Sequence, residues 1–255
     1  MNLIDTHAHL YVSDFDNDRK EVLDRSIAAN INKILLPAID SASHAAMLSL
    51  EQEHPSHCIS MMGVHPCSIK EDYKNELKIA RSYLDQRKFI AVGEIGLDFY
   101  WDKTFTDQQL EAFHQQTEWA LDLDIPIAIH SRNATDECIQ VVEEHQQGKL
   151  KGVFHCFSGD VNQARKIIDL GFYLGIGGVV TFKNAGLDKV IEAIGLQHLV
   201  LETDAPYLAP MPFRGKRNES SYLKYVVDKL ALIFGVSEED IANITTANAK
   251  KLFGC

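Results

Sequence analysis

The stretch GVFHCFSGDVNQARKIIDLGFYLGI, residues 152–176, contains the repeating unit from which we predict the fold. It begins with a short apolar run at 152–154, continues through an amphipathic helix predicted over 161–170, and ends on a second apolar run at 172–176. Continuous apolar runs, unlike alternating ones, are typical of strands that are buried on both faces of a parallel sheet. This order of strand, helix and strand therefore predicts a parallel β-α-β unit.

The same unit recurs along the chain. Eight short apolar runs lie at residues 3–4, 33–37, 58–64, 89–93, 126–129, 152–154, 172–176 and 199–201. Further helices are predicted over 107–123, 220–234 and 237–253, and Ser237 is the expected cap of the last one. Eight such units in 255 residues favour a closed (β/α)8 barrel of the TIM type over an open doubly wound sheet. We therefore expect one α/β barrel domain over residues 1–255.

The composition excludes several classes of protein. With 45% hydrophobic residues the chain is too apolar for a disordered protein, and no run approaches the roughly 18 apolar residues of a membrane span. The five cysteines form no CxxC pair and the N-terminus lacks a secretory signal pattern, so we expect a cytoplasmic protein with reduced thiols. No feature of the sequence indicates an obligate protein partner. The formal charge of -11 is unusual for a nucleic-acid-binding protein, which generally carries a basic surface.

Ionisable side chains follow six of the eight predicted strands. The active site of a parallel barrel lies at the carboxyl ends of its strands, so this position bears on function. The residues found there are His7 and His9 after the first run, His65 after the third, Glu94 after the fourth, His130 after the fifth, His155 after the sixth and Asp204 after the eighth. A lone histidine is commonly structural, and a carboxylate at a strand end can cap a helix. Their shared position at one end of the barrel nevertheless predicts a site.

The donor atoms of this set favour two divalent metal ions per chain. Imidazole and carboxylate ligands favour zinc, with manganese, nickel or magnesium as alternatives. Glu94 lies in the middle of the set along the chain, and its two oxygens allow it to bridge the ions. A bound cation lowers the pKa of water towards about 7, and we expect Asp204 to coordinate one ion, orient that water and accept its proton. Glu94 and Asp204 are thus the predicted catalytic residues.

A basic segment follows the eighth strand. Arg214, Lys216 and Arg217 lie in the region of the last barrel loops, which form the usual phosphate site of this fold. Arginine binds phosphate in a bidentate manner and lysine adds a point charge, so we predict phosphate binding by Arg214 and Lys216; a solvated basic loop is the alternative. We expect Arg132 either to contact a second phosphate or to form a surface salt bridge. We expect His65 to line the pocket, in a structural or a substrate-contacting role.

Two groups of residues near the strand ends have supporting roles in this prediction. Asp98 and Glu202 are expected to orient ligand imidazoles through the ring nitrogen that does not face the metal. Trp101, together with Phe99 and Tyr100, lies near the exit of the fourth strand and is expected to offer either a stacking surface or a packed anchor for its loop.

The sequence resembles the TatD-like metal-dependent hydrolases, the TatD deoxyribonuclease family within the amidohydrolase-type barrels. The matching segments, in order, are IDTHAHL (4–10), GVHP (63–66), VGEIGLD (92–98), IHSR (129–132), HCFSG (155–159), LETDAPYL (201–208), FRGKRN (213–218) and TTANA (245–249). The resemblance implies a TIM-type barrel, a divalent-metal centre and hydrolysis of ester bonds, commonly in DNA. It also implies how the ligands divide: His7, His9, Glu94 and Asp204 around one ion, and Glu94, His130 and His155 around the other.

We therefore expect a divalent-metal-dependent phosphodiesterase of the deoxyribonuclease type that uses a metal-activated water. The cations at the barrel mouth would confine the positive field to that mouth, so the expected substrates are DNA ends, single-stranded DNA or a small phosphoester. One alternative is a carboxylic-ester hydrolase, such as a D-aminoacyl-tRNA deacylase, or another small-molecule amidohydrolase. Related cyclic amidases use a carbamylated lysine where this chain has Glu94, which disfavours that branch. A third possibility is a non-catalytic scaffold stabilised by metal. The presence of Asp204 disfavours it, because a purely structural metal site could use histidine or cysteine at that position.

Overall fold

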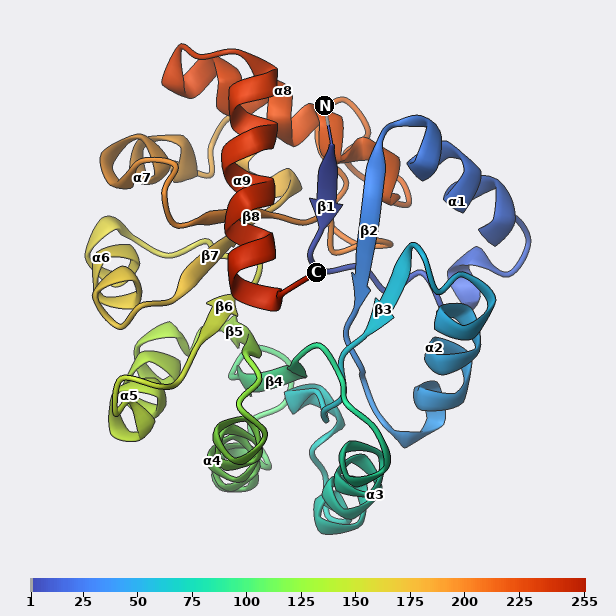
Figure 1. Ribbon diagram of the computed structural model, residues 1–255. Helices are drawn as coiled ribbons and strands as arrows, with labels where there is room; N and C mark the ends of the chain where they lie inside the picture. The colour runs from blue at the N-terminus through green and yellow to red at the C-terminus, as the bar shows by residue number, and fades with distance from the viewer. Residues whose placement is uncertain (1) are drawn as a thin grey trace.

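The protein is described here by a computed structural model of residues 2–255, which shows a closed barrel of eight parallel strands surrounded by helices (Figure 1). The strands are β1 (Leu3–Asp5), β2 (Ile31–Leu36), β3 (Cys58–Ser60), β4 (Val92–Asp98), β5 (Ile127–Arg132), β6 (Gly152–Phe154), β7 (Tyr173–Ile176) and β8 (Leu199–Leu201). Neighbours are hydrogen-bonded in sequence order within β1–β3 and within β4–β8. Parallel bridges from Met62 to Val92 and from Ala8 to Ala205 join the two groups and close the ring. The predicted (β/α)8 architecture is confirmed.

Helices alternate with the strands and form the outer layer. They are α1 (Arg19–Ala28), α2 (Ser41–Glu53), α3 (Tyr73–Gln86), α4 (Thr106–Leu123), α5 (Thr135–His145), α6 (Val161–Asp169), α7 (Leu187–Ile194), α8 (Leu223–Phe234) and α9 (Glu238–Phe253). Ser237 caps α9 as predicted, because its hydroxyl accepts the amide of Asp240 while the Asp240 carboxylate accepts the amide of Ser237. The helix predicted over 220–234 is wrong in its first turn, since Ser220–Tyr222 form a separate 3-10 turn. In residues 2–255, no helix is long and apolar enough to span a membrane.

The fourth strand differs most from its prediction. The apolar run at 89–93 predicts a strand that ends before Glu94, whereas β4 begins at Val92 and continues to Asp98, with every residue buried. Glu94 therefore lies inside the strand and not after it. The pattern failed here because a glutamate normally marks the end of a buried run, and this one is buried among polar partners in the barrel.

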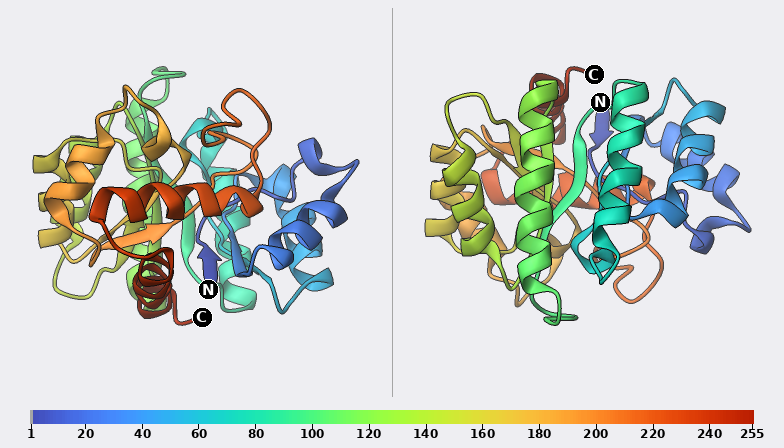
Figure 2. Two further views of the ribbon diagram at one scale, coloured as in Figure 1. Left: turned by 90° about the horizontal axis from the view of Figure 1, so that it is seen from above. Right: turned by 90° about the horizontal axis from the view of Figure 1, so that it is seen from below.

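The amino end of the barrel is closed by apolar side chains. The interior cluster contains Ile4, Leu35, Met61, Ala91, Ala128, Val153, Tyr173 and Val200, which come from all around the ring. α9 crosses this end, and its Leu252 and Phe253 complete the same cluster. Figure 2 shows both termini on this face, while the loops that follow β4 and β8 project from the opposite face. Only the carboxyl end of the barrel is therefore left to form a site.

Candidate metal centre

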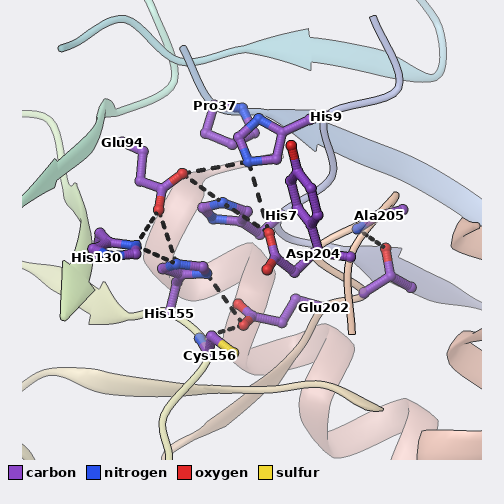
Figure 3. Close-up of polar contacts among 12 residues, drawn as sticks. His7, His9, Pro37, Glu94, His130, His155, Cys156, Glu202, Asp204 and Ala205 are labelled. Atoms are coloured by element: carbon purple, nitrogen blue, oxygen red, sulfur yellow. Dashed lines mark hydrogen bonds and ion pairs between the residues drawn. The ribbon is translucent and has the colours of Figure 1, made fainter. Parts of the chain in front are cut away.

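The carboxyl ends of the strands bring together the ionisable residues that the sequence singled out (Figure 3). His7 and His9 follow β1, Glu94 lies in β4, His130 lies in β5, His155 follows β6, and Asp204 lies three residues beyond β8. None of these side chains is more than 16% exposed. Buried ionisable groups are costly unless they are paired or bind metal, so this convergence calls for a chemical explanation.

A bulge in β4 directs Glu94 into the centre. Gly93 and Ile95 pair with two consecutive residues of β5, which leaves Glu94 without a partner in that ladder. The backbone N–H of Glu94 donates instead to the carbonyl of Ala38, beyond the end of β2, at 3.2 Å. A bulge of this kind turns a side chain away from the regular alternation of a strand. Nothing in the pattern of apolar runs signals it.

The Glu94 carboxylate contacts imidazoles on both sides. Its Oε2 lies 3.1 Å from His7 Nε2 and 3.4 Å from His9 Nε2, while Oε1 lies 2.9 Å from His130 Nδ1, 2.9 Å from His155 Nε2 and 3.3 Å from His65 Nε2. Each oxygen thus serves a separate group of histidines, as a bridging carboxylate would. Burial alone would raise the pKa of Glu94, but the surrounding imidazoles outweigh burial and hold this pKa well below its ordinary value.

Three sets of donor atoms converge closely enough to hold an ion. They are His7, His9 and Glu94; His7, His155 and Asp204; and His65, Glu94 and His130, each within 4.8 Å. Two nitrogen ligands of one tetrahedral zinc ion lie roughly 3.3 Å apart, given Zn–N bonds of about 2.0–2.1 Å. His130 Nδ1 lies 3.4 Å from His155 Nε2 and 3.3 Å from His65 Nε2, which matches that spacing. The residues present therefore fit a centre of two divalent ions.

Tyr11 determines which nitrogen of His9 faces the centre. Its hydroxyl donates to the carbonyl of Pro37 at 2.6 Å, so its oxygen is left to accept a hydrogen bond from Nδ1–H of His9 at 3.0 Å. This tautomer leaves the lone pair of His9 on Nε2, the atom that points towards Glu94 and Asp204. Tyr11 was not predicted as a site residue, although it lies two residues after the H-x-H pair, on the same face of an extended chain.

Two acids lie beside other ligand histidines, on the side away from the centre. Asp98 Oδ2 accepts a hydrogen bond from Nε2 of His130 at 2.9 Å, which leaves Nδ1 for the centre. Glu202 Oε1 lies 3.5 Å from Nδ1 of His155, whose Nε2 faces the centre. A Cβ atom at Gly175 would overlap the Glu202 carboxylate, so only glycine leaves room for this acid. Both acids lie where the sequence predicts them, and partners of this kind orient metal ligands.

Asp204 lies on the side of the centre formed by the segment after β1. Its Oδ1 is 3.7 Å from His9 Nε2 and 3.9 Å from His7 Nε2, and its backbone N–H donates to the carbonyl of His7 at 2.8 Å. Its φ of 57° lies in the left-handed region, which aspartate adopts more readily than most residues. Burial raises the pKa of Asp204 to about 6, against the opposing charges of His155 and His9.

A cavity of about 770 Å³ opens over the centre, which is within the usual size of a ligand site. Glu94, His130, His155 and Asp204 belong to its lining, together with His65, Trp101, Arg132, Phe182, Tyr207, Arg214 and Lys216. The predicted substrate-contacting residues His65, Arg132, Arg214 and Lys216 thus share one cavity with the candidate ligands. Much of its lining comes from the segment after β8, and the loop after β4 contributes Trp101.

The positions of two residues differ from those that the sequence predicts. His65, expected in the pocket wall, also lies within one of the three donor sets. Arg217, expected beside Arg214 in the basic mouth, instead donates to Asp18 at 2.6 and 2.7 Å and to the carbonyl of Asp14 at 2.7 Å. Arg217 therefore ties the loop after β8 to the segment after β1, and it does not line the cavity. The chain pattern alone did not pair residues so far apart in sequence.

Sequence and fold are both similar to those of known proteins. Residues 4–254 match a protein family described as TatD related DNase. The chain is 38% identical over 252 residues to the uncharacterized metal-dependent hydrolase YabD of Bacillus subtilis, with 98% of each chain covered. It is 32% identical over 257 residues to the 3'-5' ssDNA/RNA exonuclease TatD of Salmonella typhimurium, again with 98% of each covered. Among solved structures, it is similar to the TatD homolog YjjV of Escherichia coli K12, with a TM-score of 0.93, 30% identity, and coverage of 99% of this chain and 98% of that one.

Proposed function

This chain belongs to the TatD-related DNase family and is a metal-dependent hydrolase, and from this premise we propose that it is a phosphodiesterase acting on the ends of single-stranded nucleic acid. The relative from Salmonella that is named as a 3'-5' ssDNA/RNA exonuclease supports this substrate class. The single observation that carries the proposal is that free cations and the candidate metal ligands line the same cavity.

The centre would hold its two ions on the two oxygens of Glu94. His7, His9 and Asp204 would complete one set of ligands, and His130 and His155 the other, as the contacts of Glu94 suggest. When bound, divalent cations polarise a phosphoryl oxygen and make water more acidic. The nitrogen-rich donor set favours zinc, with manganese, nickel or magnesium as alternatives.

Asp204 is the proposed general base. It belongs to the lining of the cavity, and its carboxylate is the most exposed acid of the centre, at 13%. A carboxylate that both faces substrate and contacts two ligand imidazoles is placed to orient the attacking water and accept its proton. Glu94 also lines the cavity but is only 2% exposed, and its contacts with imidazoles on both sides fit a role in holding the two halves of the centre together.

Arg214 and Lys216 are the proposed phosphate ligands. Both line the cavity, and within residues 2–255 no carboxylate lies within ion-pair distance of either, whereas Arg217 is paired with Asp18. The guanidinium of Arg214 lies 4.5 Å from the ring centroid of Phe182, which supports the side chain without neutralising its charge. Such free cations stabilise the charge that develops on phosphorus oxygens during transfer. They also give an acidic protein, of charge -11, a local attraction for phosphate.

A substrate panel tests this proposal. Metal-loaded protein is given single-stranded DNA labelled at either end, duplex DNA, an aryl phosphodiester and a carboxyl ester, and initial rates are compared across zinc, manganese, nickel and magnesium. We expect the single strand to be shortened from one end and the carboxyl ester to react far more slowly than the phosphodiesters. Faster turnover of the carboxyl ester would refute the proposal.

The variant Arg214→Ala is tested on the same substrates. Charge-assisted hydrogen bonds contribute about 1.5–3 kcal/mol, so we expect kcat/KM for phosphodiesters to fall roughly tenfold or more. Arg165→Ala, which removes an exposed arginine of α6, is the matched control and should change nothing. An equal loss on phosphate and carboxyl esters would mean that Arg214 does not act on phosphate.

A further inference from the structure

An exposed aromatic pair on the cavity wall has no part in the phosphate chemistry. Tyr100 and Trp101 lie two and three residues beyond the end of β4, and their side chains are 51% and 68% exposed. Their rings lie 4.9 Å apart at 83°, and Trp101 belongs to the lining of the cavity. A tryptophan that is two-thirds exposed contributes little to the core, so its place beside the metal centre points to a ligand.

The loop that carries these rings is held by a residue of the centre. One oxygen of Asp98, Oδ1, accepts the backbone N–H of Tyr100 at 2.9 Å and that of Trp101 at 3.0 Å. The other oxygen, Oδ2, accepts from Nε2 of His130 at 2.9 Å. One buried carboxylate thus positions both a candidate metal ligand and the aromatic pair, which fixes the rings relative to the reacting centre.

Arg132 completes this wall. Its guanidinium carbon lies 4.0 Å from the centroid of the Tyr100 ring and 5.1 Å from that of Trp101. No carboxylate among residues 2–255 is within ion-pair distance of Arg132, so its charge is held in place by the rings and stays available to an anion. Because Arg132 lies closer to Tyr100, that ring mainly supports the arginine, and the more exposed Trp101 keeps a free face.

We propose that Trp101 stacks on an unpaired nucleobase of the substrate while Arg132, supported by Tyr100, binds the phosphate attached to it. This assignment rests on the proposed function and extends it, because it makes Trp101 a residue that selects single strands. A base within a duplex is stacked on both sides and hydrogen-bonded to its partner, so it cannot offer a face to Trp101. Stacking on an aromatic side chain accepts any base, which suits cleavage without sequence preference.

Two cations on different elements of the cavity support a nucleotide chain as the occupant. Arg132 is the last residue of β5 and Arg214 lies in the loop after β8, each over an aromatic ring, and both line the same cavity as the candidate ligands. A nucleotide chain repeats a phosphate and a base at each step, and so it matches an alternation of cations and exposed rings.

The test measures binding without metal, so that no cleavage occurs. The chain has two tryptophans, and Trp119 is only 7% exposed, so quenching of fluorescence by a ligand reports on Trp101. At low salt with a chelator present, tetrathymidylate should quench the fluorescence, and an abasic tetramer of equal charge should not. Trp119→Phe should keep the quenching, which makes it the matched control. Equal quenching by the two tetramers, or loss of quenching in Trp119→Phe, would overturn the assignment.

Variants separate stacking from loss of folding. By fluorescence anisotropy with end-labelled tetramers, Trp101→Ala should weaken binding of tetrathymidylate about tenfold and leave the abasic tetramer unaffected. Trp101→Phe should restore part of the difference. Unchanged affinity in Trp101→Ala would refute the stacking role.

Cleavage of the abasic tetramer, which has phosphodiesters but no aromatic ring, distinguishes this inference from the proposed function. Metal-loaded Trp101→Ala should lose far more of its rate on tetrathymidylate than on the abasic tetramer. If the natural sequence fails to cleave it and also fails on single-stranded DNA, the proposed function is wrong, while the metal-free binding results still decide the stacking role.

Discussion

The two ends of the barrel are built from opposite kinds of side chain. At the amino end, β1 contributes Ile4 to an apolar cluster that Leu252 and Phe253 of α9 seal. At the carboxyl end, the segment after β1 contributes His7 and His9 to a buried group of imidazoles and carboxylates, open to a cavity. The same strands thus supply packing at one end and chemistry at the other.

This division has an energetic consequence. Apolar burial stabilises a fold in proportion to the area removed from water, whereas a buried ionisable group costs free energy unless partners compensate for it. We therefore expect substitutions at the amino end to reduce stability and keep function. Substitutions at the carboxyl end should instead remove metal binding or turnover, and each variant below tests that division.

Glu94→Ala should have the largest effect. It removes the carboxylate whose two oxygens contact five histidines, so both ions should be lost and phosphodiester turnover should fall by at least about 100-fold. Removing one partner of a buried, ion-paired group leaves the surrounding imidazoles without their counter-charge, so the free energy of unfolding of the metal-free protein should also fall. Metal content by atomic emission, turnover and urea unfolding check the three parts. Glu94→Gln, which keeps the volume, should behave similarly; a variant with full metal content and activity would contradict the bridging role.

Phe253→Ala should have an intermediate effect, on stability and not on metal binding. Truncating a nearly buried phenylalanine in the amino-end cluster should lower the free energy of unfolding by about 3 kcal/mol, with metal content and KM retained. Urea denaturation measures the loss. Leu232→Ala removes a side chain that is 81% exposed and should cost less than about 0.5 kcal/mol. Loss of metal from folded Phe253→Ala protein would show that the two ends are coupled.

Tyr11→Phe should have the smallest effect, confined to one ion. Without the hydroxyl, Nδ1 of His9 loses its acceptor and Nε2 is no longer held as the free lone pair. We expect affinity for the ion on the His9 side to fall roughly tenfold, and affinity for the other ion to stay unchanged, in a competition titration with zinc. Tyr173→Phe, in the amino-end cluster, is the control and should leave both affinities unaltered. A uniform weakening of both sites would contradict the local role of Tyr11.

The sequence predicted the barrel architecture and most residues of the site, but it did not predict the exact strand ends or the contacts among those residues. Apolar runs located the strands because burial on both faces leaves a continuous signal, and the ionisable residues after those runs are the ones that meet in the structure. The exact end of β4 was mispredicted because Glu94 is buried in a bulge. Arg217 was grouped with the free cations because its partner, Asp18, is distant in sequence.

The sequence by itself determined the parallel barrel and the chemistry of its carboxyl end, since periodicity and residue type are local properties of the chain. Only the tertiary structure decided which oxygen of Glu94 serves which histidines, how Tyr11 sets the tautomer of His9, and how Asp98 links His130 to the loop of Trp101. These contacts join segments from different strands, and their distances depend on how the ring closes. Closure is a property of all eight strands together, so no single stretch of sequence encodes it.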